Sequence, residues 1–501
     1  MANSKYEYVK SFELEDEVML PNLILVRLTY RNFERFSEIH EFEKPNDGKA
    51  LNLMNSCAIA VLEEYPDVVF SYGFHDEYSF VFKKTSKFYQ RRASKILSLI
   101  ASFFSSTYAT KWKEFFPHKE LKYPPSFHSR VISCASLEVL QVYLGWRQNA
   151  CHDDNLYRTC FWMLIRSGKT KEEAKEALKD GQKQGRNELL FQMFGINYKK
   201  LPEMFRQGSC ILKIEVEDVV KCDENGMPIK RLRRKPDIFH TQKIVAKKFW
   251  NEKSVLVKEL GTLEEIGKIT PEYIRSFLFE NKLLPSTYII IRIDGCHFHR
   301  FSDIHEFEKP NDSRALNLMN ACAVAVLNEF QDVVFAYGVS DEYRKLLSSI
   351  NDILEILQDY LAWRQVDCHI NNQYNTCFWM LVKSGKTKAE AQKCLKGTQT
   401  REKYKLLSQH FCIDYNSLPV MFRHGSSVYR VKKSTSAIPE NDNNGELQEV
   451  IVDHCNIIEQ SFWKAHSSIL GETPDDSDSQ IIASTDASIS EGHTSNYFCE
   501  Q

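Results

Sequence analysis

Apolar residues recur along the chain with two alternating periods. Short runs such as LILVRLTY (23–30), SFVFKK (79–84) and SRVISCAS (129–136) are rich in β-branched and aromatic residues and predict strands. The longer stretch QRRASKILSLIASFFSSTYATKW (90–112) has apolar residues at helical spacing and predicts a helix. The order strand, helix, hairpin, helix, strand describes a split βαβ, ferredoxin-like sheet. The expected fold class is therefore α+β.

This pattern occurs twice in the chain. The segment IHEFEKPND begins at Ile39 and again, identically, at Ile304, which is an offset of 265. A second pair of matching blocks begins at Tyr143 and Tyr360, with an offset of only 217, so the second copy is shorter by 48 between the blocks. The sequence thus predicts a tandem duplication of a domain-sized unit. We expect one domain over 1–260, a shortened one over 261–470, and an acidic, Ser-rich, disordered tail over 471–501.

The missing segment falls in the second half of the predicted sheet. We expect the second copy to keep its first strand, its first helix and one arm of its hairpin, followed directly by a helical segment (347–365). Because RKLLSSIND (344–352) replaces SFVFKK, we expect the hairpin tip Ser340–Tyr343 to have no returning strand. The backbone groups of Val333–Tyr337 would then need cover from the first copy or from another subunit.

Composition narrows the class of protein. The chain is 43% hydrophobic and 26% charged, which is ordinary for a globular protein. Its apolar runs are too short to span a bilayer, and Met1–Lys10 lacks the apolar core of a signal peptide. We therefore expect no membrane partner and a nuclear (nucleoplasmic) or cytoplasmic location. The 14 cysteines include no CxxC pair, which favours reduced thiols. The net charge of -2 leaves nucleic-acid binding to local patches such as KRLRRK (230–235).

Carboxylates mark one end of the predicted second sheet. Asp294 ends an apolar strand and is followed by Gly295, while Asp341 and Glu342 lie at the hairpin tip. If the strand and the hairpin are neighbours, these carboxylates converge, and with a carbonyl from the glycine turn they form an oxygen-only site suited to Mg²⁺. A pair of such ions could activate a hydroxyl and neutralise a leaving pyrophosphate. Either motif alone is weak, because an Asp-Glu turn is usually only solvated.

Several blocks together resemble the tRNA-histidine guanylyltransferase family, the 3′-to-5′ polymerases. They are RIDGCHFHRF, KPNDSRALNLMN, YGVSDEY, RRASK, CHINNQYNT and LPVMFRHGS, and the tandem arrangement resembles the plant-type members. The resemblance implies two polymerase-palm-like domains, the second with a truncated palm. It also implies addition of GMP to the 5′ end of tRNA-His, with ATP activation and GTP as donor. The implied partners are tRNA-His, GTP, ATP and a second tandem chain in a pseudo-tetramer.

The resemblance also assigns roles to residues. It implies that Asp294, Gly295 and Asp341 hold two Mg²⁺ ions and that Glu342 belongs to the same catalytic cluster. The implied GTP contacts are Asp294, Gly295, Cys296, His297, Phe298, His299, Ser340 and Asp341. Less specific matches are Lys309 for the triphosphate, Arg92 and Lys95 for phosphate, His152 and His369 for tRNA, and the acidic pair Asp76 and Glu77 of the first copy. A surface lysine and core histidines are the plain alternatives.

Each copy departs from the family pattern in a different place. The first copy has Thr29 and Tyr30 where the second has Asp-Gly, and a neutral threonine cannot supply the charge that holds Mg²⁺. A catalytically degenerate paralogue that binds tRNA, or that pairs with an active homologue, is therefore a rival function. A nucleotide cyclase on a similar palm would not need the KPND and HINN blocks. A splice form or an incomplete gene model would also account for the segment that the second copy lacks.

Overall fold

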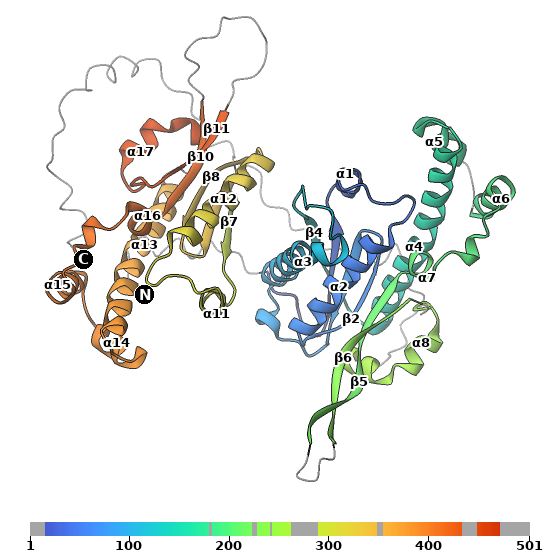
Figure 1. Cartoon of the computed structure of the whole chain (residues 1–501), viewed down its shortest axis with the longest axis horizontal. Helices are drawn as coiled ribbons and strands as arrows, with labels where there is room; N and C mark the ends of the chain where they lie inside the picture. Colours follow the sequence, from blue (N-terminus) through green and yellow to red (C-terminus); the bar gives the residue numbers. More distant parts are fainter. Residues whose placement is uncertain are drawn as a thin grey trace, which may run out of the picture. The chain divides into compact units, whose positions relative to one another are not determined.

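The computed structural model describes residues 16–179, 183–222, 228–240, 243–261, 289–347, 354–432 and 448–470. They form two compact units, the first unit (16–261) and the second unit (289–470) (Figure 1). The predicted tail over 471–501 lies outside the described residues. Within these ranges, no helix has both the length and the apolar character needed to cross a bilayer.

The first unit is built on a six-stranded antiparallel sheet with the order β4-β1-β3-β2-β5-β6. Its first four strands have the 4-1-3-2 order of a split βαβ, ferredoxin-like sheet, which confirms the predicted fold class. The last two strands extend the sheet as a long hairpin (Figure 1). The strands are β1 (Leu23–Tyr30), β2 (Val68–Phe74), β3 (Glu77–Phe82), β4 (Phe127–Cys134), β5 (Ser209–Cys222) and β6 (Pro228–Phe239).

Helices cover both faces of this sheet. Alternate residues of β1 enter different cores: Val26 and Leu28 pack with α2 and α3, whereas Leu23 and Leu25 pack with α4. Asp47 begins α2 by accepting a hydrogen bond from the Ala50 N–H at 2.9 Å. The helices are α1 (Phe33–Ile39), α2 (Gly48–Glu64), α3 (Ala93–Phe115), α4 (Leu137–Arg166), α5 (Lys171–Lys179), α6 (Lys183–Phe194), α7 (Glu203–Arg206), α8 (Lys247–Glu252) and α9 (Ser254–Leu260).

The second unit has a five-stranded antiparallel sheet with the order β11-β10-β8-β9-β7. Its strands are β7 (Ile289–Asp294), β8 (Val333–Val339), β9 (Glu342–Leu347), β10 (Ser426–Lys432) and β11 (Gln448–Asp453). Its helices are α11 (Phe298–Ile304), α12 (Ser313–Glu329), α13 (Leu354–Lys383), α14 (Lys388–Leu395), α15 (Thr400–Lys405), α16 (Val420–His424) and α17 (Gln460–Ala465). β7, α12, β8 and β9 repeat the order of β1, α2, β2 and β3.

The prediction that this hairpin lacks its returning strand is wrong. The segment EYRKLL forms β9, which pairs with β8 from Val339↔Glu342 to Val333↔Leu347 and with β7 from Asp294↔Glu342 to Ile289↔Leu347. The other edge of β8 pairs with β10, so Val333–Tyr337 does not lose its partners. Tyr343 and Leu346 are buried in the cores on the two faces of the sheet, so the segment anchors its strand on both sides despite its charged residues.

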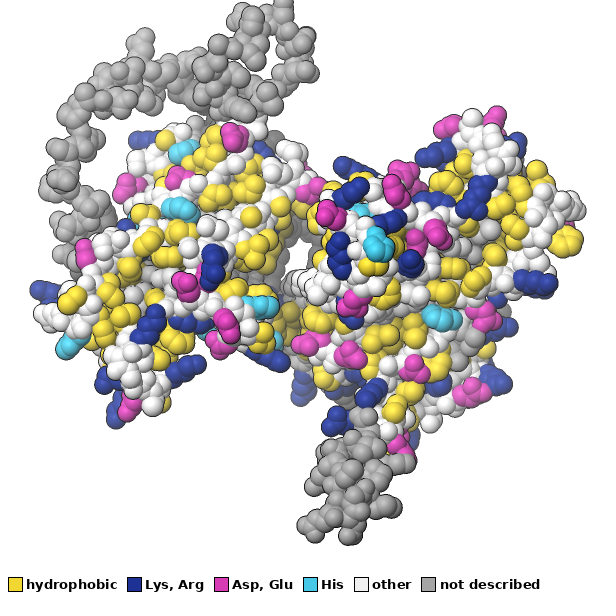
Figure 2. All heavy atoms as spheres, viewed as in Figure 1, with side chains coloured by type: hydrophobic (Ala, Val, Ile, Leu, Met, Phe, Trp, Pro, Cys, Tyr) yellow, Lys and Arg dark blue, Asp and Glu magenta, His cyan; other side chains and the backbone are white. Residues whose placement is uncertain are grey.

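What the described part of the second unit lacks is a counterpart of α3 and β4. In the first unit, β4 pairs with β1 over eight residue pairs, from Leu23↔Cys134 to Tyr30↔Phe127. No strand among the described residues pairs with the corresponding edge of β7. Hydrophobic side chains accordingly reach the surface of this unit around α12 (Figure 2). The truncation removes one helix and the edge strand, and leaves the hairpin intact.

Candidate functional site

The acidic residues of the second unit meet at one end of its sheet. β7 ends at Asp294, which lies directly opposite Glu342, the first residue of β9. The two-residue loop Ser340–Asp341 joins β8 to β9, and the Gly295 N–H donates to the Asp341 carbonyl at 3.1 Å. The antiparallel register therefore brings the strand end and the hairpin tip together, with three carboxylates in neighbouring positions.

Gly295 allows the close approach of these two segments. A Cβ atom built on Gly295 would lie 2.7 Å from Asp341 Oδ2 and 2.9 Å from its Cβ, closer than real Cβ contacts. Any side chain at this position would therefore displace the Asp341 carboxylate. Ser340 has a φ of 54°, which is a left-handed conformation that costs energy for a residue with a side chain. The loop holds Asp341 against the glycine in this strained form.

Electrostatics at the hairpin tip favour a cation. The pKa of Asp341 is raised, because burial disfavours the charged carboxylate and because Asp294 and Glu342 add negative charge nearby. Within the described ranges, no group of three His, Cys, Asp or Glu side chains forms a metal site. The predicted donors are instead Asp294, Asp341 and the Gly295 carbonyl. This set contains only oxygen, so it fits Mg²⁺ and does not fit a structural zinc ion.

Glu342 is held by arginines. Arg292 Nε and Arg344 both donate to its Oε1, and Arg364 from α13 donates to Oε2 at 2.9 Å. Arg292 also donates to Asp294 Oδ2 at 3.0 Å, which links the two carboxylates through one guanidinium group. Both oxygens of Glu342 are thus engaged on the α13 side of the sheet. Charge-assisted hydrogen bonds of this kind fix the orientation of a carboxylate.

The first unit keeps the same arginine–glutamate arrangement. Arg27 donates to Glu77 at 2.5 Å, and Arg147 donates to its two oxygens at 2.7 and 2.6 Å. The sequence interpretation missed these arginines, although the signal was present. Arg27 and Arg147 recur in the second copy as Arg292 and Arg364, the first within the strand pattern and the second within the repeated WRQ.

Tyr30 fills the position that Gly295 has in the second unit. Its ring is buried against Phe36, Tyr108 and Phe127, with centroid separations of 4.8, 5.9 and 4.6 Å. The Tyr30 N–H still donates to the Asp76 carbonyl at 2.8 Å, so the backbone arrangement is unchanged. The first unit therefore keeps the turn and uses the position of Gly295 for core packing.

The Asp76 carboxylate is also redirected. Its Oδ1 accepts a hydrogen bond from His75 Nδ1 at 2.9 Å. Burial alone would raise the pKa of Asp76, but the hydrogen bond and charge of His75, together with Arg158, lower it. This carboxylate is therefore paired with His75 within the first unit.

The predicted GTP contacts lie around the start of α11. Cys296, His297 and His299 are exposed, and Phe298 is half-buried beside Gly295. His297 has a φ of 54° and lies just before the helix. These residues follow Asp294 directly, so they border the acidic end of the sheet.

Lys309 is anchored between helices. Its Nζ donates to Ser302 Oγ at 2.6 Å and lies 5.8 Å from the centroid of the Trp379 ring. The neighbouring Asn311 accepts from Asn372 Nδ2 at 2.7 Å, which joins the KPND loop to the HINN segment of α13. Both motifs therefore contribute to one contact between this loop and α13.

The two predicted tRNA histidines lie inside their helical subdomains. His369 is buried against the Tyr415 ring, and the Tyr415 hydroxyl donates to its carbonyl at 3.3 Å. Burial, with His424 and Arg423 nearby, lowers the pKa of His369 to about 4, so its ring is neutral at pH 7. His152 has the same relation to Tyr198 in the first unit. The His369 ring is therefore a buried core histidine, whereas His152 is half-buried, and the tRNA role of both residues stays a prediction.

The RRASK block combines a structural residue with surface residues. Arg91 is buried and donates to the carbonyl groups of Val18 and Asn22 at 2.8 and 2.6 Å. Arg92 precedes α3 and pairs with Asp16 at 3.5 Å, while Lys95 is exposed. Both predicted phosphate-binding residues belong to the first unit alone.

Comparisons with known proteins identify the family of the chain. A family model described as tRNAHis guanylyltransferase matches residues 6–135 and 271–376, and the model of the Thg1 C terminal domain matches 138–259 and 355–469. tRNA(His) guanylyltransferase 1 of Arabidopsis thaliana is 61% identical, over 94% of this chain and 91% of the relative. The chain belongs to the tRNA(His) guanylyltransferase family.

Two further comparisons describe its place in the guanylyltransferase family. tRNA(His) guanylyltransferase 2 of Arabidopsis thaliana is 58% identical over 94% of this chain and 99% of the relative. The crystal structure of the Saccharomyces cerevisiae tRNA(His) guanylyltransferase is 40% identical, covering 42% of this chain and 93% of that one, with a TM-score of 0.40. Each family model matches the chain twice, as expected for a tandem member. The nuclear or cytoplasmic location stays a prediction.

Proposed function

We propose that this chain transfers GMP to the 5′ end of tRNA(His) at the second unit, with ATP for activation and GTP as donor. The observation that carries the proposal is the convergence of Asp294 and Asp341 around Gly295, whose missing side chain makes room for the Asp341 carboxylate. The family membership of the chain supplies the reaction class.

In this proposal, Asp294, Asp341 and the Gly295 carbonyl hold two Mg²⁺ ions. Bound magnesium would supply charge neutralisation for the triphosphate and activation of the attacking hydroxyl. Arg292 orients Asp294, and Glu342 stays between its arginines, where it fixes the hairpin relative to α13. The exposed turn Cys296–His299 borders the triphosphate of GTP, and Lys309 supports the loop behind it.

The first unit has a non-catalytic role in this scheme. Tyr30 occupies the glycine position, and Thr29 supplies no negative charge, so this end of the sheet does not bind Mg²⁺. The basic segment Lys230–Lys235, which lies in β6, and the RRASK block are positively charged features suited to tRNA phosphates. Two tandem chains would then form the pseudo-tetramer in which one tRNA contacts both kinds of unit.

The test is a set of matched aspartate variants assayed for Mg²⁺-dependent GMP transfer to tRNA(His). Asp294→Ala and Asp341→Ala should abolish transfer, whereas Asp76→Ala in the first unit should keep most of it. Circular dichroism of each variant controls for folding. Transfer that survives both second-unit changes would refute the assignment. Wild-type chain that binds tRNA(His) tightly and transfers nothing would favour the degenerate paralogue.

A further inference from the structure

The second unit presents apolar side chains that the first unit buries. Ile291 and Ile293 of β7 are 45% and 46% exposed, and Leu318 of α12 is 62% exposed. Their counterparts in the first copy of the repeat are Val26, Leu28 and Leu53, each 0% exposed. Cys322 of α12 is likewise exposed, whereas its counterpart Cys57 is buried. We call Ile291, Ile293, Leu318 and Cys322 the open face.

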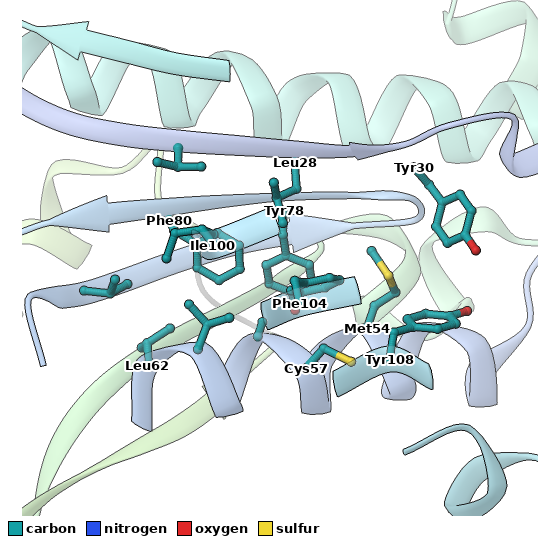
Figure 3. Packing of buried hydrophobic residues seen from close by; sticks show 14 of the residues in the cluster. Leu28, Tyr30, Met54, Cys57, Leu62, Tyr78, Phe80, Ile100, Phe104 and Tyr108 are labelled. Atoms are coloured by element: carbon teal, nitrogen blue, oxygen red, sulfur yellow. The ribbon is translucent and has the colours of Figure 1, made fainter. Parts of the chain in front are cut away.

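In the first unit, one helix–strand element covers these positions. Ile96, Ile100, Phe104 and Tyr108 of α3 are fully buried in the same core as Val26, Leu28, Leu53 and Cys57. Figure 3 shows side chains of β1, α2 and α3 meeting in this layer. β4 completes the cover by pairing along the edge of β1. The first unit therefore shows which kind of element would cover the open face, namely a helix packed on the sheet and followed by an edge strand.

We propose that the open face of the second unit is a docking site for an amphipathic helix followed by a β-strand, supplied by another protein. The helix would take the place of α3 on β7 and α12, and the strand would pair with the edge of β7. Strand addition to an exposed sheet edge and helix docking on an apolar surface are both established modes of recognition. An uncovered strand edge beside exposed isoleucines otherwise favours aggregation.

One polar difference defines the chemistry of this partner further. Lys345 of β9 occupies the position of Phe80, which in the first unit lies 6.0 Å from Phe104 of α3. Lys345 is only 8% exposed and lies on the α12 side of the sheet, beneath the place of the docked helix. A helix with phenylalanine there would leave the ammonium group without a polar partner. The partner helix therefore carries a carboxylate where α3 has Phe104.

A second copy of the chain is a weaker occupant for a geometrical reason. Two β7 edges could pair, but each copy would bring α12 and no counterpart of α3. The exposed isoleucines on both sides of the seam would stay without a helix above them. The element that fits is of the α3–β4 kind, and each first unit already buries its own.

The experiment uses the full-length chain and synthetic peptides of residues 86–134 with Cys134→Ser. The readout is alkylation of Cys322 by iodoacetamide, followed by mass spectrometry. Exposed Cys394 and Cys412 serve as controls for general reactivity, and buried Cys57 as a control for opening of the first unit. Four peptides are compared: one with Phe104 retained, one with Phe104→Glu, one with the neutral Phe104→Gln, and a scrambled peptide of the same composition.

The Phe104→Glu peptide should slow alkylation of Cys322 and leave Cys394 and Cys412 unchanged. It should bind about tenfold more tightly than Phe104→Gln, as expected for a hydrogen bond to a charged group. Lys345→Gln should remove this preference, and Ile293→Glu should abolish protection. Absence of protection at about 100 µM peptide, a weak affinity for a specific site, would overturn the proposal. Equal protection of Cys322 by the scrambled peptide would also overturn the proposal. Protection of Cys322 that increases with the concentration of the chain and needs no peptide would overturn it too, because it would indicate self-association.

Discussion

Replacing Lys345 with methionine should stabilise the second unit. The lysine is nearly fully buried, and burial lowers the pKa of its amine from 10.5 to about 8. Holding the ammonium form at pH 7 therefore costs up to about 3 kcal/mol, since each pH unit corresponds to about 1.4 kcal/mol. Methionine fills a similar volume without the charge. We expect the free energy of unfolding of the second unit to rise by about 1–3 kcal/mol.

The lowered pKa of Lys345 determines how the stability of the second unit changes with pH. The unfolded lysine keeps its proton up to about pH 10.5, and the folded one only up to about pH 8. Between these values the unfolded state binds more protons, so the wild-type second unit gains stability as the pH rises. The advantage of Lys345→Met should be complete below pH 8 and should fall by about half between pH 7 and pH 9.5.

Thiol labelling during urea unfolding can measure the two units separately. Cys368 and Cys377 are buried in the second unit, and their counterparts Cys151 and Cys160 are buried in the first. Wild type and variant are compared at each pH, so that the change in thiol reactivity cancels. Lys345→Met should move only the second-unit midpoint. A stabilisation that does not change with pH, or a shift of both units together, would refute the burial argument.

Three further changes test the acidic end of the second unit and the tRNA contacts. Gly295→Ala should lower GMP transfer at least tenfold with little change in the melting temperature, because the added Cβ meets Asp341 at 2.7 Å; activity at the wild-type level would mean that this contact is easily relieved. Asp341→Asn should remove transfer and should raise the stability of the second unit at pH 7. This gain in stability should shrink as the pH falls through the raised pKa of Asp341, because the wild-type carboxylate then takes up its proton. The affinity for tRNA(His) should fall steeply with salt, and neutralising Lys230–Lys235 should flatten that dependence; a filter-binding series with unchanged slope would exclude this segment.

Sequence periodicity was sufficient for the fold and for the end of the sheet that carries the carboxylates. Alternation in β1 and helical spacing in α3 predicted both elements, and the repeat transferred the first strand, the first helix and the first hairpin arm to the second unit as β7, α12 and β8. The role of EYRKLL was not predictable in this way. It combines three charged residues with a tyrosine and two leucines, and only pairing with β7 and β8 on both sides decides that it is a strand.

The arginine contacts of Glu342 could not be predicted from the sequence alone. Its arginines come from β7, β9 and α13, and the sequence does not state which side of the sheet each one reaches. The sequence also did not predict that His369 and Arg91 are buried, for a related reason. Both lie in motifs that resemble functional blocks, while their contacts are with the protein core.

The open face also determines how the second unit should behave when it is expressed alone. Residues 266–501 should aggregate or melt without cooperativity, although their hairpin is complete. The physical cause is the open face, with its two isoleucines on β7 and its uncovered leucine on α12. Analytical ultracentrifugation of this fragment, with and without the residue 86–134 peptide, measures the effect. A monodisperse fragment without peptide would contradict it.

In the proposed scheme the first unit is non-catalytic, and the burial of Tyr30 opposes a return to the Asp-Gly pair of the second unit. Replacing Tyr30 with glycine alone would empty an aromatic site between Phe36 and Phe127, at a cost of about 3–5 kcal/mol. Replacing Thr29 with aspartate alone would add a carboxylate beside a turn that tyrosine still occupies. Neither single step restores a metal site, and the first removes a large share of a typical domain's stability. Selection for a stable fold therefore acts to keep Tyr30, so changes in the first unit that leave this tyrosine in place are tolerated more easily than a return to glycine.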